Sequence, residues 1–140
     1  DDLTTGAIGS RDRLTYRGAI NYLIDLILAD NPRATILFVG HYDAADPGRT
    51  TLIAAQQAIA AHWSRPIWRG WEALGWSSAV EVTTTGYWSS NLWVPSGGPS
   101  QTLSMNEVWT PDGVHPAQDV SGNSIRRIVS AMLPWWQSVV

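Results

Sequence analysis

The residues with the clearest chemical potential lie near the C-terminal end, where Asp112 and His115 stand three positions apart in the run Asp-Gly-Val-His-Pro. On a turn tightened by Gly113, the carboxylate of Asp112 can fold back and accept a hydrogen bond from the Nδ1–H of the imidazole. That contact fixes the tautomer and leaves Nε2 free to take a proton from a nucleophile. Asp112 and His115 are therefore the candidate catalytic pair. The alternative is a solvated turn, because Asp-Gly and His-Pro are ordinary loop dipeptides.

A nucleophile and a metal site are the next features that such chemistry could require. Ser10 follows glycines at positions 6 and 9, but no strand-like run precedes it as a nucleophile elbow requires, so a loop or helix-cap role is favoured. His41, Asp43 and Asp46 follow a predicted strand, where α/β proteins form ligand sites, and with the C-terminal histidine they could hold a metal. We instead expect His41 to line the substrate cleft, and we expect neither a metal nor a cofactor.

Aromatic side chains dominate the segment that leads to Asp112. The chain contains 9 Trp, a residue that is costly to leave exposed and that implies an aromatic core, a sugar-like ligand surface or an interface. Because aromatic faces stack on sugar rings, the residues on this segment are candidates for substrate binding. A hydrophobic cluster under a long loop is the alternative. The candidate substrate-binding aromatic residues are Tyr87, Trp88, Trp93 and Trp109.

Apolar periodicity predicts several helices and only two strands. The run over 34–40 is short, continuous and β-branched, as in a strand buried on both faces of a parallel sheet, and 78–83 is a second candidate strand. The segment 84–111 has no periodicity. Alternation of helices and strands favours an α/β fold with a parallel sheet, but sheets usually have about four to six strands, so strands are missing. The predicted helices cover 14–30, 51–62, 66–74 and a final stretch from 121 that Pro134 kinks or ends.

The motif and its surroundings resemble a known family. Asp-Gly-x-His-Pro, followed by a small-polar turn and an amphipathic C-terminal helix, resembles the end of the SGNH (GDSL-type) hydrolases. The order of Asp1-Asp2, the helix over 14–30, Asn31-Pro32 and the strand over 34–40 is similar to the middle of that family. The resemblance implies a flavodoxin-like three-layer sandwich with a parallel sheet, in which residues 1–140 are the C-terminal part of a single domain and supply only its later strands and helices.

The resemblance also implies a function. The family's nucleophilic Ser and its oxyanion residues would precede residue 1, on a second chain or segment that supplies the N-terminal half of the domain. His115 would act as general base and then general acid, with Asp112 orienting it. We expect a serine ester hydrolase that acts on O-acyl groups of a small molecule or glycan, with O-acetyl groups on a polysaccharide favoured. The alternative is a non-catalytic, aromatic-rich glycan-binding or assembly module of an extracellular or virion structure.

Composition excludes several other classes. The chain has no Cys and a net charge of −3, which excludes disulfide frameworks and thiolate zinc sites and gives no reason to expect a nucleic-acid partner. All 9 cationic side chains are Arg, so a lysine Schiff base or a P-loop is impossible. No apolar run approaches the roughly 18 residues that a bilayer span requires. We expect a soluble protein without a membrane partner, and the glycan interpretation favours an extracellular or virion-associated location.

Overall fold

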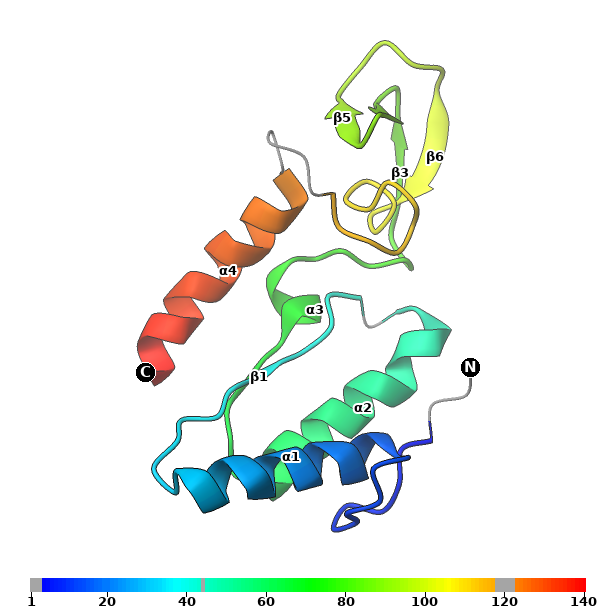
Figure 1. Ribbon diagram of the computed structural model, residues 1–140. Coiled ribbons are helices and arrows are strands. Elements are labelled where there is room, and N and C mark those ends of the chain that lie inside the picture. Colours follow the sequence, from blue (N-terminus) through cyan, green and yellow to red (C-terminus); the bar gives the residue numbers. More distant parts are fainter. Residues whose placement is uncertain (1–3, 44, 118–122) are drawn as a thin grey trace.

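The computed structural model of the chain describes residues 4–43, 45–117 and 123–140. Its first part alternates helices and strands: α1 (Tyr16–Asp30), β1 (Phe38–Val39), α2 (Pro47–His62) and β2 (Ile67–Trp68). β1 and β2 pair in parallel, and α1 packs against α2. The arrangement is a small βαβ unit, β1–α2–β2, preceded in the chain by the helix α1 (Figure 1).

The predicted first helix is confirmed and has identifiable ends. It begins at Tyr16, where the side chain of Thr15 accepts a hydrogen bond from the backbone N–H of Gly18, which satisfies one of the free donors of the first turn. It ends at Asp30, because the residue that follows precedes a proline and adopts extended backbone angles. The polar Asn21 is fully buried on the inner side and donates two hydrogen bonds to the entry loop, at Ile8 and Ser10.

The prediction of a helix over 66–74 is wrong in its first half. Ile67 and Trp68 form β2, and only Gly70–Ala73 are helical, as α3. The apolar spacing of this segment satisfies a helix, but extended residues here hydrogen bond to the edge of β1, and Trp68 is thereby buried against the core. The long-range pairing of β2 with β1 therefore outweighs the local helical periodicity of this segment.

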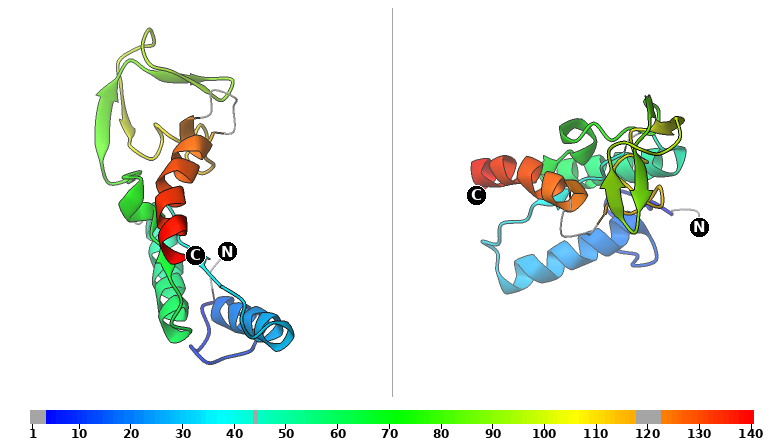
Figure 2. Two further views of the ribbon diagram at one scale, coloured as in Figure 1. Left: turned by 90° about the vertical axis from the view of Figure 1, so that its left-hand side faces the viewer. Right: turned by 90° about the horizontal axis from the view of Figure 1, so that it is seen from above.

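The aperiodic segment folds into antiparallel strands. The predicted strand over 78–83 is observed as β3 (Glu81–Thr84), which begins three residues later and ends one residue later. It pairs antiparallel with β6 (Gln101–Ser104) and does not join the parallel sheet. Between them lies the hairpin of β4 (Tyr87–Ser89) and β5 (Leu92–Val94). We call β3–β6 the β extension. Figures 1 and 2 show that it stands at one end of the molecule, away from α1 and α2.

The last helix, α4 (Asn123–Val139), is longer than predicted. Pro134 lies inside it and does not end it, so the following tryptophans, Trp135 and Trp136, are helical. One side of α4 packs against a hydrophobic core whose buried members come from β2 and the residues after α3. That core consists of Trp68, Leu74 and Trp76, with Tyr42, Trp109, Ile128, Ala131, Met132 and Trp135 packed around it.

The fold is therefore mixed α/β, with four helices and three two-stranded sheets among the described residues, one of the sheets being parallel. The α/β prediction is confirmed at this level. In the part of the chain that the structure describes, no helix is long and apolar enough to cross a membrane.

Candidate active site

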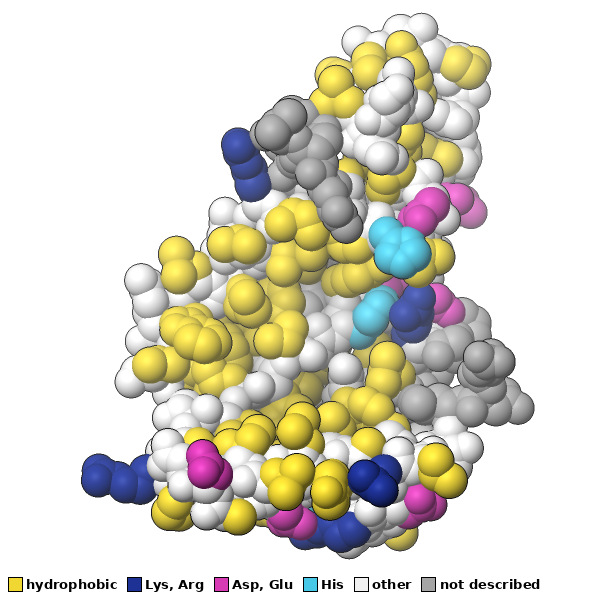
Figure 3. Space-filling model, in the orientation of Figure 1, with side chains coloured by type: hydrophobic (Ala, Val, Ile, Leu, Met, Phe, Trp, Pro, Cys, Tyr) yellow, Lys and Arg dark blue, Asp and Glu magenta, His cyan; other side chains and the backbone are white. Residues whose placement is uncertain are grey.

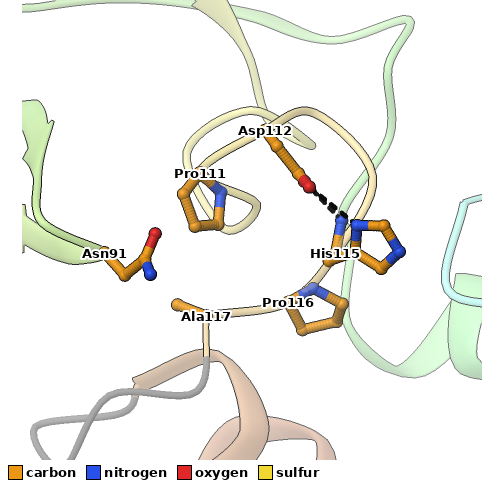
Figure 4. A pocket seen from close by; sticks show the side chains of 6 residues that line it. All are labelled: Asn91, Pro111, Asp112, His115, Pro116 and Ala117. Carbon is orange, nitrogen blue, oxygen red and sulfur yellow. Dashed lines mark hydrogen bonds and ion pairs between the residues drawn. The ribbon is translucent and has the colours of Figure 1, made fainter.

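Asp112 and His115 form a hydrogen-bonded pair within one turn of chain (Figure 4). Oδ2 of Asp112 lies 2.7 Å from Nδ1 of His115. Oδ1 of the same carboxylate accepts the backbone N–H groups of Val114 at 2.9 Å and of His115 at 2.7 Å. Gly113 has a φ of +78°, a conformation that glycine adopts without strain. The contact expected from the sequence is thus made by an Asp-initiated turn.

The electrostatics of the pair suit general base catalysis. Hydrogen bonds from the backbone N–H of His115, then from its ring and from the N–H of Val114, hold the pKa of the Asp112 carboxyl well below its usual range. The carboxylate is therefore ionised at neutral pH and fixes the proton of the imidazole on Nδ1. The His115 side chain is 76% exposed, and its ring points outward, away from Asn91 (Figure 4). Nε2 is thus accessible to a substrate or a nucleophile.

Three neighbouring parts of the chain hold the loop of residues 110–117, which we call the Asp112 loop. The hydroxyl of Tyr42, just after β1, donates to the carbonyl oxygen of Val114. The buried side chain of Asn106 donates to the carbonyl oxygen of Gly113 at 2.8 Å. Ser124, in the first turn of α4, donates to the carbonyl oxygen preceding the loop at 2.6 Å. These contacts come from the loop after β1, the turn after β6 and the last helix, so the loop is held from three parts of the chain.

A hollow of about 310 Å³ adjoins the pair, and the turn between β4 and β5 forms its far wall. Ser90 and Asn91 make that turn with φ values of 50° and 63°, which is the two-residue geometry that matches the twist of a hairpin. Sequence reasoning missed Asn91; its only signal was the short polar pair between two aromatic runs. The residues that line this hollow are Asn91, Pro111, Asp112, His115, Pro116 and Ala117 (Figure 4).

A second hollow of about 470 Å³ shares Pro111 and Asp112 with the first. Two of the predicted substrate-binding residues, Tyr87 and Trp88, line it together with Gln101 and other residues of the β extension. The indole N–H of Trp88 donates to the carbonyl oxygen of Glu107 at 2.7 Å, which fixes the ring. The structure thus brings Tyr87 and Trp88 next to the catalytic candidates.

The other two predicted aromatic residues, Trp93 and Trp109, line a smaller apolar hollow of about 90 Å³ together with Trp88. Trp93 is the register partner of Trp88 and contacts it edge-on, with 5.4 Å between ring centroids. Trp109 stacks on the fully buried Trp76 at 5.3 Å, and the guanidinium of Arg127 lies over it. The structure therefore places Trp109 in a hydrophobic cluster under the loop, the alternative raised for it above.

His41 lies on the other side of Tyr42 from the Asp112 loop. Its ring stacks on Tyr42 at 4.2 Å, and its Nδ1 accepts the backbone N–H of Asp43 at 3.1 Å. Burial, followed by the nearby charge of Arg49, lowers the pKa of His41, so it is neutral at physiological pH. In Figure 3, two histidine side chains lie close together beside arginine and acidic side chains, between the β extension and the helices.

The structure places the remaining candidates elsewhere. The hydroxyl of Ser10 accepts the backbone N–H of Asp12 at 3.0 Å, in the entry loop that packs on α1. Among the described residues, no group of three His, Cys, Asp or Glu side chains could hold a metal ion. Asp43 is buried and accepts the backbone N–H groups of Ala45 and Ser78, so it links the end of β1 to the segment before β3.

Comparisons with models of known protein families, with curated proteins and with solved structures found no match to this chain. The interpretation of the site therefore rests on its own geometry and on the motif.

Proposed function

We propose that this chain supplies the acid–base half of a serine ester hydrolase of the SGNH type. The observation that carries the proposal is the 2.7 Å contact between Oδ2 of Asp112 and Nδ1 of His115, with the ring exposed. An oriented, accessible imidazole backed by an ionised carboxylate is the arrangement that activates a hydroxyl nucleophile.

The proposed reaction proceeds through an acyl-enzyme. A serine hydroxyl outside residues 1–140 attacks the ester carbonyl carbon, and Nε2 of His115 takes its proton. Asp112 stabilises the resulting imidazolium, which then gives the proton to the departing alcohol oxygen. Water attacks the acyl-serine in the second half, with His115 again accepting and then returning the proton to the serine. The hydrogen-bond donors that stabilise the oxyanion would also come from residues outside 1–140.

We further propose that the domain is a flavodoxin-like three-layer sandwich. In that fold, β1 and β2 would be the later strands of the parallel sheet, α2 would connect them, and α4 would be the last helix. The parallel register of Phe38 with Ile67 and of Val39 with Trp68 supports that assignment. So does the position of Tyr42 and His41 just after β1, because α/β ligand sites form beyond the carboxyl ends of parallel strands.

The proposed substrate is an O-acyl group, preferably O-acetyl, on a polysaccharide. The hollow lined by Tyr87, Trp88 and Gln101 supports this choice, because it offers aromatic faces and an amide beside Asp112. Sugar rings present apolar C–H faces and hydroxyl groups that match such a surface. An extracellular or virion-associated location would follow from that substrate.

The direct test is His115→Ala in the complete protein, assayed on a chromogenic acetyl ester and on an O-acetylated polysaccharide. We expect hydrolysis of both to fall by roughly 10³-fold or more, because the variant loses the imidazole that accepts the proton of the serine hydroxyl. His62→Ala, at the exposed end of α2, is the matched control and should retain full activity. Equal thermal midpoints of the variants would show that the fold is intact, and undiminished hydrolysis by His115→Ala would disprove the proposal.

The second candidate is a non-catalytic glycan-binding or assembly module. One observation favours it. Among the described residues, the only hydrogen-bond partner of the His115 ring is Asp112, so no described serine is bound to the ring as a nucleophile. A serine-reactive fluorophosphonate distinguishes the two functions. A labelled serine in the intact protein, found by mass spectrometry and lost after prior denaturation, supports the hydrolase; no label supports the module.

A further inference from the structure

The second hollow, the one of about 470 Å³ beside Asp112, offers a ligand mainly hydrogen-bond acceptors. Several of the donors on its lining side chains are engaged by the protein itself. The indole N–H of Trp88, Nε2 of Gln101 and the hydroxyl of Thr110 each donate to a main-chain carbonyl oxygen at 2.7 Å. A ligand that fills this hollow must therefore bring donors of its own.

Carboxylate oxygens are the strongest acceptors that line this hollow. Oε2 of Glu107 accepts the backbone N–H and the hydroxyl of Ser104, both at 2.8 Å, while no described residue donates to Oε1. The second carboxylate is that of Asp112, whose side chain is about half exposed. The hollow thus presents two acidic groups to a ligand, one of them with an oxygen that no described residue binds.

No cationic side chain from the surrounding chain offsets these carboxylates. The sequence contains neither Arg nor Lys between Arg69 and Arg126. That stretch includes the whole β extension and the Asp112 loop, and it supplies every residue that lines the two hollows beside Asp112. In the view of Figure 3, the β extension carries hydrophobic, uncharged polar and acidic side chains but no basic one. The local field therefore favours a positively charged ligand and opposes a negatively charged one.

Aromatic rings form part of the wall of the same hollow. Tyr87 is 36% exposed, and the ring of Trp88 is fixed by its bond to the carbonyl oxygen of Glu107. The face of an aromatic ring attracts a cation, and its apolar surface also suits the C–H face of a sugar ring. The volume lies within the range of roughly 300–1,000 Å³ that is usual for small-molecule sites.

We propose that the second hollow is a subsite for a sugar residue that carries a free ammonium group. An ammonium group brings three donors and a positive charge, so it can donate to Oε1 of Glu107 and lie against the ring of Tyr87 or Trp88. A uronic acid or a sulfated sugar would instead bring a negative charge to two carboxylates with no Arg beside them. The substrate would then be an O-acylated polymer of amino sugars whose amines are free.

This inference rests on the proposed function for the role of the hollow as a substrate subsite, but binding can be measured without hydrolysis. The probes are short oligomers of glucosamine, of N-acetylglucosamine and of glucuronic acid, none of which contains an O-acyl ester. Calorimetry on the complete protein is done at a pH where the amine is protonated. We expect the glucosamine oligomer to bind about tenfold more tightly than its N-acetylated form, with the uronic acid oligomer weakest. Equal binding of the first two, or tighter binding of the third, would overturn the proposal.

The matched variants are Glu107→Gln and Glu81→Gln. The new amide oxygen at position 107 can still accept the two Ser104 donors, so the change removes the charge and keeps the turn. We expect the Kd of the glucosamine oligomer to rise about tenfold and that of the N-acetylated oligomer to change less than about twofold. Glu81 is in register with Ser104, on the other face of the β3–β6 pair from Leu103, and does not line the hollow. Equal weakening by both variants would show only a general attraction of cations to an acidic protein, against the proposal.

NMR locates the bound oligomer. The indole N–H resonance of Trp88 should shift when the glucosamine oligomer binds, whereas that of Trp63, which donates to Asn21 of α1, should not. Binding without a shift at Trp88 would place the sugar elsewhere and overturn the assignment. Oligolysine tests whether the cation belongs to a peptide instead, and tighter binding of oligolysine than of the glucosamine oligomer would reject the sugar.

The two proposals can fail separately. If the glucosamine oligomer binds as expected but the wild-type protein hydrolyses no O-acetyl ester, the ammonium site stands and the hydrolase proposal falls. If hydrolysis is lost in His115→Ala but glucosamine is not preferred, the hydrolase proposal stands and the ammonium site falls.

Discussion

The Asp112 loop and the exposed apolar residues of α4, which we call the outer stripe, are organised in opposite ways. The outer stripe consists of Ile125, Val129, Leu133 and Trp136. The loop is exposed and polar, and its key carboxylate makes its three hydrogen bonds to residues within three positions. The outer stripe is exposed and apolar, and its side chains extend over about three turns of helix without a covering layer among the described residues. One region has its hydrogen-bond partners in place, and the other is an apolar surface that the described residues leave partly exposed.

The two regions differ because the hydrogen bonds of the Asp112 turn are local, whereas the burial of apolar side chains requires contacts between distant parts of the chain. A turn of four residues can preorganise a base because its hydrogen bonds need no distant element. A hydrophobic layer needs another element, because burial of apolar area is non-local. Substitutions in the loop should therefore affect turnover with little change in stability.

The largest effect is expected for Asp112→Asn. The asparagine oxygen can still accept the two backbone N–H groups, but its NH₂ group faces Nδ1 of His115 and forces the proton onto Nε2. That tautomer cannot accept a proton from a serine, so kcat should fall by roughly 10²–10⁴-fold. The thermal midpoint should fall only by the small contribution that the ionised carboxylate makes to stability. Steady-state kinetics on the acetyl ester measure the effect, with Asp30→Asn at the end of α1 as the control of equal charge change. Full activity of Asp112→Asn would show that the pair is only a structural turn.

A smaller effect is expected for Tyr42→Phe, which removes the hydroxyl that donates to Val114. The loop loses its tie to the end of β1, so kcat should fall by about tenfold while KM is unchanged. The free energy of unfolding should fall by about 0.5–1.5 kcal/mol. Tyr22→Phe, on the outward side of α1, is the control. A normal kcat for Tyr42→Phe would show that the loop is positioned without its tie to the end of β1.

The smallest effect concerns the titration of Asp112. Because its pKa is lowered in the folded state, the carboxylate contributes stability above its ordinary pKa of about 3.9, and this is lost as the pH falls toward the lowered value. In ¹³C NMR, the side-chain carboxyl should titrate below the midpoint found in urea-unfolded protein. In His115→Ala the midpoint should rise only partway, since the largest cause is the backbone N–H of residue 115, which remains. A wild-type midpoint equal to that in urea would contradict the turn geometry.

The three long helices could be predicted from the sequence because their apolar residues repeat at helical spacing. The segment over 14–30 was predicted as a helix and is observed as Tyr16–Asp30. β2 could not be predicted, because two extended residues carry no periodicity and Ile67 and Trp71 also fit a helix. The hairpin of β4 and β5 was missed because its turn uses Ser90 and Asn91 at positive φ without a glycine.

The site divides in the same way. Asp112 and His115 followed from the sequence because the atoms that hold them lie within four residues. The tie from Tyr42 to Val114 spans 72 positions and leaves no local signal. Which aromatic side chains line a hollow and which enter the core was also undetermined: Tyr87 and Trp109 lie on one aperiodic segment, yet only Tyr87 lines the hollow beside Asp112.

By itself, the sequence determined the contact between Asp112 and His115 and three of the four helices, since turn geometry and helical periodicity are properties of neighbouring residues. The tertiary structure decided where β2 pairs, how the β extension folds, which tryptophans are buried and which side of α4 remains uncovered. Each of these depends on contacts between residues far apart in the chain, where burial and strand pairing outweigh local preference.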